Sequence, residues 1–133
     1  MDGSNKPLIL IAEDDVAVSM VVEDILEEAG FRFLAVVNGE EAIIALEDRP
    51  DSFCALITDI RIAGEATGWD VARRARELQP VLPIIYMTGD SAVQWTAHGV
   101  PGSVLLQKPF VGAQLVTALT NLLNEAGTAG IGQ

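Results

Sequence analysis

The chain has 133 residues, and 50% of them are hydrophobic, which is enough to bury the core of one ordinary domain over residues 1–133. Its 19 acidic and 8 basic side chains give a formal net charge of -11, which argues against nucleic acid or a membrane surface as a direct partner. The single cysteine, Cys54, excludes an internal disulfide, and no secretory leader or apolar run of roughly 18 residues is evident, so we expect a cytoplasmic protein.

The first half of the chain is predicted to contain three strands. The first and third are short apolar runs without polar alternation, as expected for buried strands of a parallel sheet that is covered on both faces. The stretches after the first two strands carry apolar residues at helical spacing and end at turn-forming residues. The predicted strands are 8–12, 31–37 and 53–59, with helices from Val16 to the stop signal at Gly30 and from Asn38-Gly39 to the residue before Pro50.

The second half continues the alternation after a glycine-containing loop. Pro80 and Pro83 bracket the turn into the fourth strand. We place the core of the domain at about residues 7–124 and expect residues 125–133 to form a loose tail. The predicted helices are about 69–79, 91–98 and 111–124, and the predicted strands are 84–88 and 103–106.

Five strand-then-helix units in strict alternation predict an α/β fold. Right-handed crossovers between parallel strands place helices on both faces of the sheet. The carboxyl ends of parallel strands share one edge, and in open α/β sheets this edge carries the sites. The polar residues expected to meet there are Glu13, Asp14, Asp59, Thr88 and Lys108.

Three carboxylates at one edge need a cation or bound protons to offset their mutual repulsion. Two like charges about 4 Å apart repel by ~4 kcal/mol at an effective dielectric constant of ~20. Mg²⁺ accepts oxygen ligands and commonly works alongside phosphate oxygens, so it is the expected cation. Lys108 adds a further positive charge and Thr88 a hydroxyl. An aspartate in such surroundings is arranged to attack a phosphoryl group, which makes Asp59 the candidate nucleophile.

This ordered set of residues closely resembles the receiver domain of two-component response regulators over roughly residues 7–124. The resemblance rests on the acidic pair Glu13-Asp14, on Asp59 at the end of the third strand, on Thr88-Gly89, and on Lys108-Pro109-Phe110. It implies a flavodoxin-like, doubly wound sheet of five parallel strands in the order 2-1-3-4-5, with five helices.

The resemblance also implies a role for each site residue. Asp59 would accept phosphate from a histidine kinase or histidine phosphotransfer protein, and Lys108 would pair with the acyl phosphate. The Lys108–Pro109 peptide bond would be cis. Glu13, Asp14, Asp59 and the backbone carbonyl of Arg61 would hold Mg²⁺. The phosphorylated form would act as a bacterial signalling switch and not as a turnover enzyme. Phosphorylation would change the surface formed by the fourth helix, the fifth strand and the fifth helix. That surface would then engage a downstream protein partner or a second copy of the chain.

Several positions depart from the usual receiver pattern. Ala63 stands where a proline is common, and the segment from Asp59 to Gly68 is about one residue longer than in the chemotaxis member of the family. Leu105 replaces the tyrosine or phenylalanine of the usual switch, so the aromatic half of that switch is missing. Arg61 and Asp90 occupy positions that flank the phosphoryl group in this family, and we hypothesise that Arg61 shields the phosphate or pairs with it.

Three alternative functions fit the sequence less well than a receiver. A haloacid dehalogenase-type phosphatase also uses an aspartate nucleophile with Mg²⁺, but it needs a second aspartate where Arg61 stands. A nucleotide or flavin binder needs a glycine-rich first loop, whereas this loop is Glu13-Asp14-Asp15. A receiver-like interaction module that works without phosphorylation would be marked by a missing acid or lysine, and none is missing.

Other polar and aromatic residues have structural explanations. Asp15 fits the start of a helix better than a metal site. Cys54 lies within a predicted buried strand and is expected to fill the core. We expect His98 at the surface near a helix end, and Trp69 and Trp95 to complete packing or a protein interface.

Overall fold

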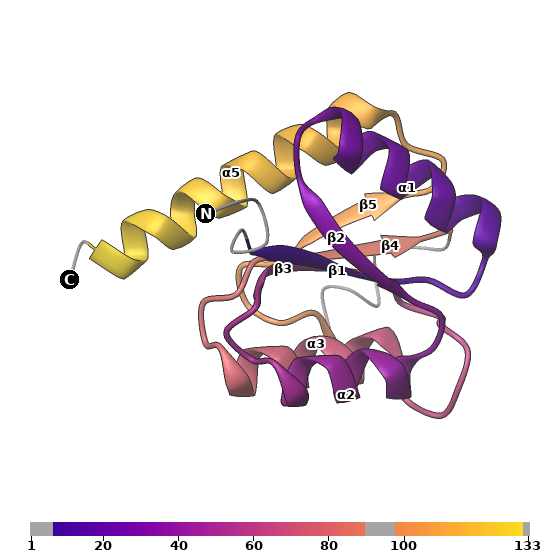
Figure 1. Cartoon of the computed structure of the whole chain (residues 1–133), viewed down its shortest axis with the longest axis horizontal. Coiled ribbons are helices and arrows are strands. Elements are labelled where there is room, and N and C mark those ends of the chain that lie inside the picture. Colours follow the sequence, from indigo (N-terminus) through magenta and orange to yellow (C-terminus); the bar gives the residue numbers. More distant parts are fainter. Residues whose placement is uncertain (1–6, 90–97, 132–133) are drawn as a thin grey trace.

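A parallel sheet of five strands forms the centre of the computed structural model, which describes residues 7–89 and 98–131 (Figure 1). The strand order is β2-β1-β3-β4-β5, as the resemblance to receiver domains implied. The strands are β1 (Leu8–Ala12), β2 (Arg32–Val36), β3 (Phe53–Asp59), β4 (Ile84–Thr88) and β5 (Val104–Gln107). The predicted bounds of β3 and β4 are confirmed, whereas β2 is one residue shorter at each end and β5 lies one residue further along the chain.

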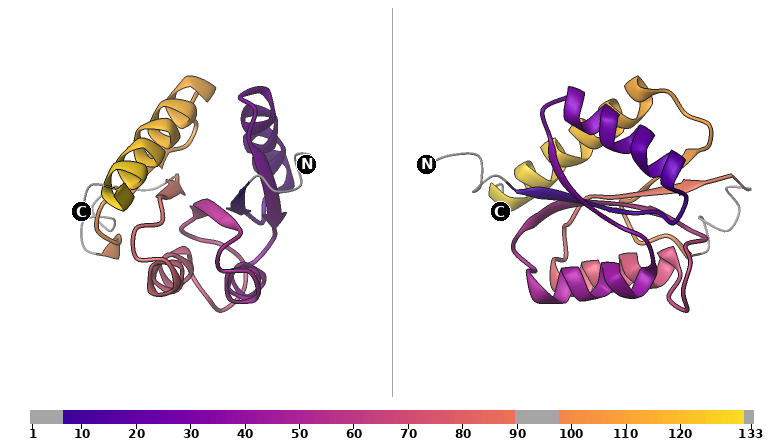
Figure 2. Two further views of the ribbon diagram at one scale, coloured as in Figure 1. Left: turned by 60° about the vertical axis from the view of Figure 1, so that its left-hand side comes forward. Right: turned by 45° about the vertical axis from the view of Figure 1, so that its right-hand side comes forward.

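Helices cover both faces of the sheet. Figures 1 and 2 show α1 and α5 on one face and α2 and α3 on the other. The described helices are α1 (Val16–Glu28), α2 (Gly39–Asp48), α3 (Gly68–Leu78) and α5 (Gly112–Ile131). The helix predicted at 91–98 falls almost wholly on residues 90–97, outside the described residues, so the fifth helix stays a prediction. Within the described ranges, none of the helices combines the length and hydropathy of a membrane span.

The sheet separates two hydrophobic cores. Successive residues of a strand point to opposite faces, so Ile9 and Ile11 of β1 contact the α1 and α5 side while Leu10 and Ala12 contact the α2 and α3 side. All four side chains are fully buried. Burial on both faces explains why β1, β3 and β4 are apolar almost throughout, and it leaves the strand ends as the place for polar residues.

The prediction of a loose tail at residues 125–133 was wrong for most of that segment. The last helix does not end near Asn124 but continues to Ile131. Glu125, Ala126 and Ala129 favour helix, and the two glycines among them each cost only about 1 kcal/mol relative to alanine. No proline stops the helix. Figure 1 shows the end of α5 extending beyond the sheet.

Candidate functional site

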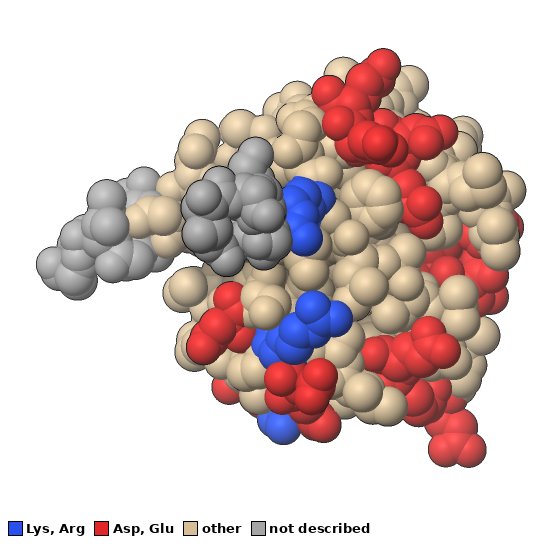
Figure 3. Space-filling model, viewed as in Figure 1, with Lys and Arg blue, Asp and Glu red and all other residues tan. Residues whose placement is uncertain are grey.

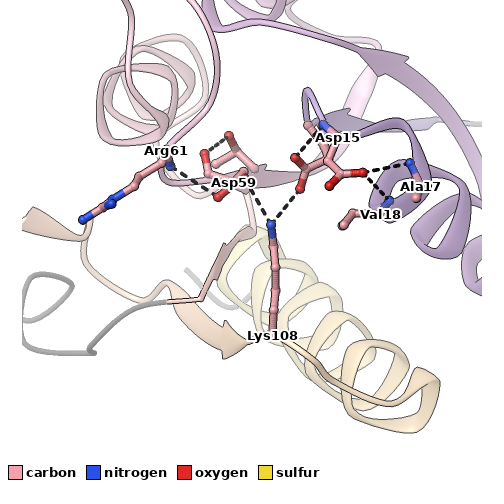
Figure 4. Close-up of polar contacts among 8 residues, drawn as sticks. Asp15, Ala17, Val18, Asp59, Arg61 and Lys108 are labelled. Atoms are coloured by element: carbon pink, nitrogen blue, oxygen red, sulfur yellow. Dashed lines mark hydrogen bonds and ion pairs between the residues drawn. The ribbon is translucent and has the colours of Figure 1, made fainter.

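Glu13, Asp59 and Lys108 meet at the carboxyl edge of the sheet, where Figure 4 shows Lys108 beside Asp59. The Lys108 Nζ atom lies 3.0 Å from Glu13 Oε1 and 3.1 Å from Asp59 Oδ2. Asp59 is the last residue of β3, Glu13 follows β1 and Lys108 follows β5, so the parallel strands bring three distant parts of the chain together. The sequence-predicted convergence of these residues is therefore confirmed by the geometry.

Burial makes this ion-pair cluster electrostatically demanding. The side chain of Glu13 is 0% exposed, that of Asp59 is 12% exposed and that of Lys108 is 24% exposed. Burial raises the pKa of Glu13 above its ordinary value, although hydrogen bonds from the Asp15 amide and from Lys108 oppose the shift. Burial alone would lower the pKa of Lys108, but its hydrogen bonds to Glu13 and Asp59, and their charges, raise it. Lys108 therefore stays charged and offsets the repulsion between the two acids.

Asp14 completes a group of three acids that could hold a cation. Among the described residues, Glu13, Asp14 and Asp59 each offer a carboxylate oxygen, and these atoms all lie within 4.8 Å of one another. Asp14 is exposed, whereas the other two acids are buried. A cluster of oxygen donors that opens to solvent on one side suits a hard cation that keeps several of its own waters, as Mg²⁺ does.

Asp15 caps α1 and orients Glu13. Its Oδ1 accepts hydrogen bonds from the backbone N–H groups of Ala17, at 2.9 Å, and Val18, at 3.2 Å. Its own backbone N–H donates to Glu13 Oε2 at 3.0 Å. The prediction that Asp15 begins a helix is confirmed.

The loop after β3 holds the other Asp59 oxygen. The backbone N–H of Arg61 donates to Asp59 Oδ1 at 3.3 Å, while Lys108 contacts Oδ2. Both oxygens of the candidate nucleophile are thus oriented by the protein. Figure 4 shows the Arg61 side chain pointing away from Lys108, and the residue is exposed.

Thr88 ends β4 beside the lysine. Thr88 is 4% exposed, and its backbone carbonyl accepts the N–H of Lys108 at 2.7 Å. The Lys108–Pro109 peptide bond is cis, as the resemblance implied. The backbone of Lys108 is therefore tied to the strand that carries Thr88.

Sequence reasoning missed the role of Tyr86. This residue is fully buried on β4 and is the register partner of Leu105 on β5. Its hydroxyl accepts the backbone N–H of Val100 at 3.2 Å, and its ring centroid lies 4.8 Å from that of Trp69. An aromatic residue therefore stands next to Leu105, on the neighbouring strand. Its position two residues before Thr88, in an otherwise aliphatic strand, was the available signal.

The remaining residues singled out by sequence behave as expected where they are described. Cys54 is half-buried against the α1 and α5 core, and burial raises the pKa of its thiol, which disfavours a nucleophilic role. His98 is exposed, and its ring centroid lies 5.6 Å from that of Trp69. Trp69 is partly buried against the α2 and α3 core. Asp90 and Trp95 lie outside the described residues.

Comparisons with known proteins agree with this architecture. Residues 9–120 match the response regulator receiver domain family. The response regulator receiver protein CpdR of Brucella abortus is 35% identical over 117 residues, which cover 86% of this chain and 95% of CpdR. The phosphate regulon transcriptional regulatory protein PhoB of Rhizobium meliloti is 32% identical over 127 residues, but the match covers 90% of this chain and only 53% of PhoB.

Solved structures show the same relationship. A response regulator receiver protein from Sinorhizobium medicae superimposes with a TM-score of 0.87 at 41% identity, covering 91% of this chain and 97% of that one. The receiver domain of the sensor histidine kinase PA1611 from Pseudomonas aeruginosa, solved with a magnesium ion coordinated in its active-site cleft, gives a TM-score of 0.77 at 26% identity, covering 90% and 98%. This chain belongs to the response regulator receiver domain family of two-component signalling.

Proposed function

We propose that this chain is a phosphoacceptor receiver in which Asp59 carries the phosphoryl group. The observation that carries the proposal is the placement of the Asp59 carboxylate, which is held by Lys108 on one oxygen and by the Arg61 amide on the other, within reach of two further acids. An aspartate that is fixed in place and next to a cation is suited to nucleophilic attack on phosphorus.

The transfer step forms one bond and breaks another. An oxygen of Asp59 forms a bond to phosphorus while the bond from phosphorus to the donor breaks, namely the P–N bond of a phosphohistidine or the P–O bond of acetyl phosphate. The bonding electron pair leaves with the imidazole or acetate, and the product on the protein is an acyl phosphate. Lys108, already 3.1 Å from Asp59, stabilises the added negative charge, and the Thr88 hydroxyl is the proposed donor to a phosphoryl oxygen.

The acid cluster fits Mg²⁺. Glu13, Asp14, Asp59 and the backbone carbonyl of Arg61 would hold the ion, and the coordinated magnesium in the PA1611 receiver supports this assignment by analogy. When bound, Mg²⁺ neutralises charge on the transferring phosphoryl oxygens. Lys108 keeps the acids compatible with one another in its absence.

The proposed donor is a histidine kinase or a histidine phosphotransfer protein. The output is a phosphorylation-dependent change at the surface formed by the fourth helix, β5 and α5, read by a downstream protein or by a second copy of the chain. Phosphotransfer and dephosphorylation are self-catalysed single events on Asp59, so the chain is proposed to be a switch and not a turnover enzyme. The alternative is an interaction module that works without phosphorylation.

Intact-mass spectrometry after incubation with acetyl phosphate and Mg²⁺ tests the proposal. We expect a single phosphoryl adduct that disappears in Asp59→Asn and when Mg²⁺ is removed by a chelator. Asp51→Asn, which changes an exposed aspartate outside the site, is the matched control and should still be labelled. A wild-type protein that takes no adduct under any of these conditions would favour the phosphorylation-independent module instead.

A further inference from the structure

Glu40, in the first turn of α2, binds the loop that follows Asp59. Its Oε2 atom accepts hydrogen bonds from the backbone N–H groups of Glu65 and Ala66, each at 2.9 Å. The partners lie 25 and 26 residues away in the sequence, so this is a tertiary contact between α2 and the β3–α3 loop. One oxygen that bridges two consecutive amides fixes the orientation of both peptide groups.

The backbone of the loop fits closely against the start of α2. Gly64 has a φ of 101°, and a Cβ atom at this position would lie 2.1 Å from Glu40 Oε1. A Cβ atom on Gly39 would lie 2.3 Å from the Ala66 carbonyl oxygen, and the Gly39 N–H donates to the Ala63 carbonyl at 3.1 Å. Two glycines therefore allow the approach, and Glu40 supplies the polar contact at its centre.

The ends of the same loop are attached to the candidate site. At one end the Arg61 N–H donates to Asp59 Oδ1. At the other end the Gly68 N–H donates to the Ile60 carbonyl at 2.9 Å, and a Cβ atom on Gly68 would lie 2.3 Å from the Asp59 carbonyl oxygen. A displacement of residues 63–66 would therefore be transmitted to the backbone of Asp59 and Ile60 and to the Arg61 amide that holds the Asp59 carboxylate.

The Glu40 carboxyl is ionised in this contact. The hydrogen bond from the Ala66 amide is the largest cause of a lowered pKa of the Glu40 carboxyl, so the group is ionised at neutral pH and accepts both amides as a carboxylate.

We propose that Glu40 is a positioning residue of the phosphoacceptor site, which holds residues 63–66 so that the Arg61 backbone stays aligned with Asp59. The proposal rests on the function proposed above, because it assigns to the Arg61 carbonyl a place among the Mg²⁺ ligands. Glu40 itself touches neither Asp59 nor the acid cluster in the described contacts. Its effect passes through the loop backbone.

Two substitutions of Glu40 separate positioning from charge. Glu40→Asp keeps the negative charge but shortens the side chain by one methylene, so the carboxylate no longer reaches both amides. Glu40→Gln removes the charge but keeps an oxygen at the same reach. Glu65→Gln is the matched control, because it removes a charge from the same loop while the Glu65 backbone N–H still donates to Glu40.

The measurements are Mg²⁺ affinity by titration calorimetry and hydrogen exchange of the Glu65 and Ala66 amides. We expect Glu40→Asp to weaken Mg²⁺ binding about tenfold, the lower end of the effect of groups that orient a metal ligand, and to speed exchange at both amides. Glu40→Gln and Glu65→Gln should stay close to the wild type in both measurements. Phosphoryl labelling by acetyl phosphate should slow in Glu40→Asp at low Mg²⁺ and recover at saturating Mg²⁺.

Each outcome decides the proposal. A Glu40→Asp variant with the Mg²⁺ affinity of the wild type overturns the positioning role. So does a pattern in which Glu40→Gln weakens Mg²⁺ binding and Glu40→Asp does not, because it indicates that the charge of Glu40 acts on Mg²⁺ at long range. Gly64→Ala, which pushes against Glu40 Oε1 without changing Glu40, should weaken Mg²⁺ binding in the same direction. A wild type that binds Mg²⁺ but takes no phosphoryl group overturns the proposed function and leaves the Glu40 result readable from Mg²⁺ affinity alone.

Discussion

Lys108 is the residue whose removal should most change the balance of charge at the site. Lys108→Met keeps the apolar stem and deletes the ammonium, which leaves Glu13 and Asp59 without their shared partner. At the observed separations of 3.0 and 3.1 Å, each attraction is about 5 kcal/mol at an effective dielectric constant of ~20, before desolvation is subtracted. Breaking a fully buried pair costs about 3–5 kcal/mol net, and because Lys108 is a quarter exposed we expect about 3 kcal/mol.

Urea unfolding followed by circular dichroism at neutral pH measures this loss. In a chelator, the free energy of unfolding of Lys108→Met should fall by about 3 kcal/mol relative to the wild type. In Mg²⁺ the difference should shrink, because a divalent cation among the three acids takes over the neutralisation. The variant should also bind Mg²⁺ more tightly than the wild type, since a competing positive charge is gone, yet it should be labelled more slowly by acetyl phosphate.

Arg73→Met is the matched control. The Arg73–Asp70 ion pair spans 2.6 Å, but its side chains are 51% and 43% exposed, so its loss should cost less than about 1 kcal/mol and should not depend on Mg²⁺. If Lys108→Met behaved like this control in a chelator, the reasoning that Lys108 offsets a buried acid pair would be refuted. If it were destabilised equally with and without Mg²⁺, the acids would not be a metal site.

Three further changes test separate parts of the site. Burial raises the pKa of Glu13 above its ordinary value of 4.5, so at a pH just above 4.5 the folded state binds a proton that the unfolded state lacks. The metal-free wild type should therefore gain stability as the pH falls toward 4.5, and Glu13→Gln should lose that gain in urea unfolding. An unchanged pH profile in the variant would contradict the assignment. Arg61→Ala should shorten the lifetime of the phosphorylated protein followed by intact mass, because we hypothesise that Arg61 shields the phosphoryl group; an unchanged decay rate would rule this out. Tyr86→Phe leaves the buried Val100 N–H without its acceptor, so it should lower the free energy of unfolding in urea by about 1–3 kcal/mol without changing Mg²⁺ affinity. A loss near zero would mean that stability does not need the hydroxyl.

Sequence alone was sufficient to predict which residues meet at the carboxyl edge of the sheet, because this prediction depends on topology and not on side-chain detail. Once five apolar runs are taken as parallel strands, their carboxyl ends share an edge, and Glu13, Asp59 and Lys108 must lie near one another. The pairwise distances among them, and the burial that shifts the pKa of Glu13, required coordinates.

The features that sequence did not predict depend on contacts between distant segments. Nothing local distinguishes Glu40 from its neighbour Glu41, whose side chain accepts the nearby Val37 N–H, yet only Glu40 reaches across to the loop after Asp59 in the described contacts. The end of α5 was also missed, because residues 125–133 were expected to form a loose tail, whereas the helix continues to Ile131 and its glycines there cost little once the helix has formed.

The position of Tyr86 changes the interpretation of Leu105. Leu105 on β5 suggested that the aromatic part of the usual switch is absent, but the structure places a buried aromatic side chain directly beside it on β4. Tyr86 lies two residues before Thr88 and therefore on the same face of the strand, and it contacts Trp69 on α3 and the Val100 amide before β5. A movement of Thr88 would therefore act on Tyr86, whose ring is fully buried and whose hydroxyl accepts the Val100 N–H. We therefore expect any change at Thr88 to travel through β4 to Trp69 and Val100, and not through rotation of an aromatic side chain on β5.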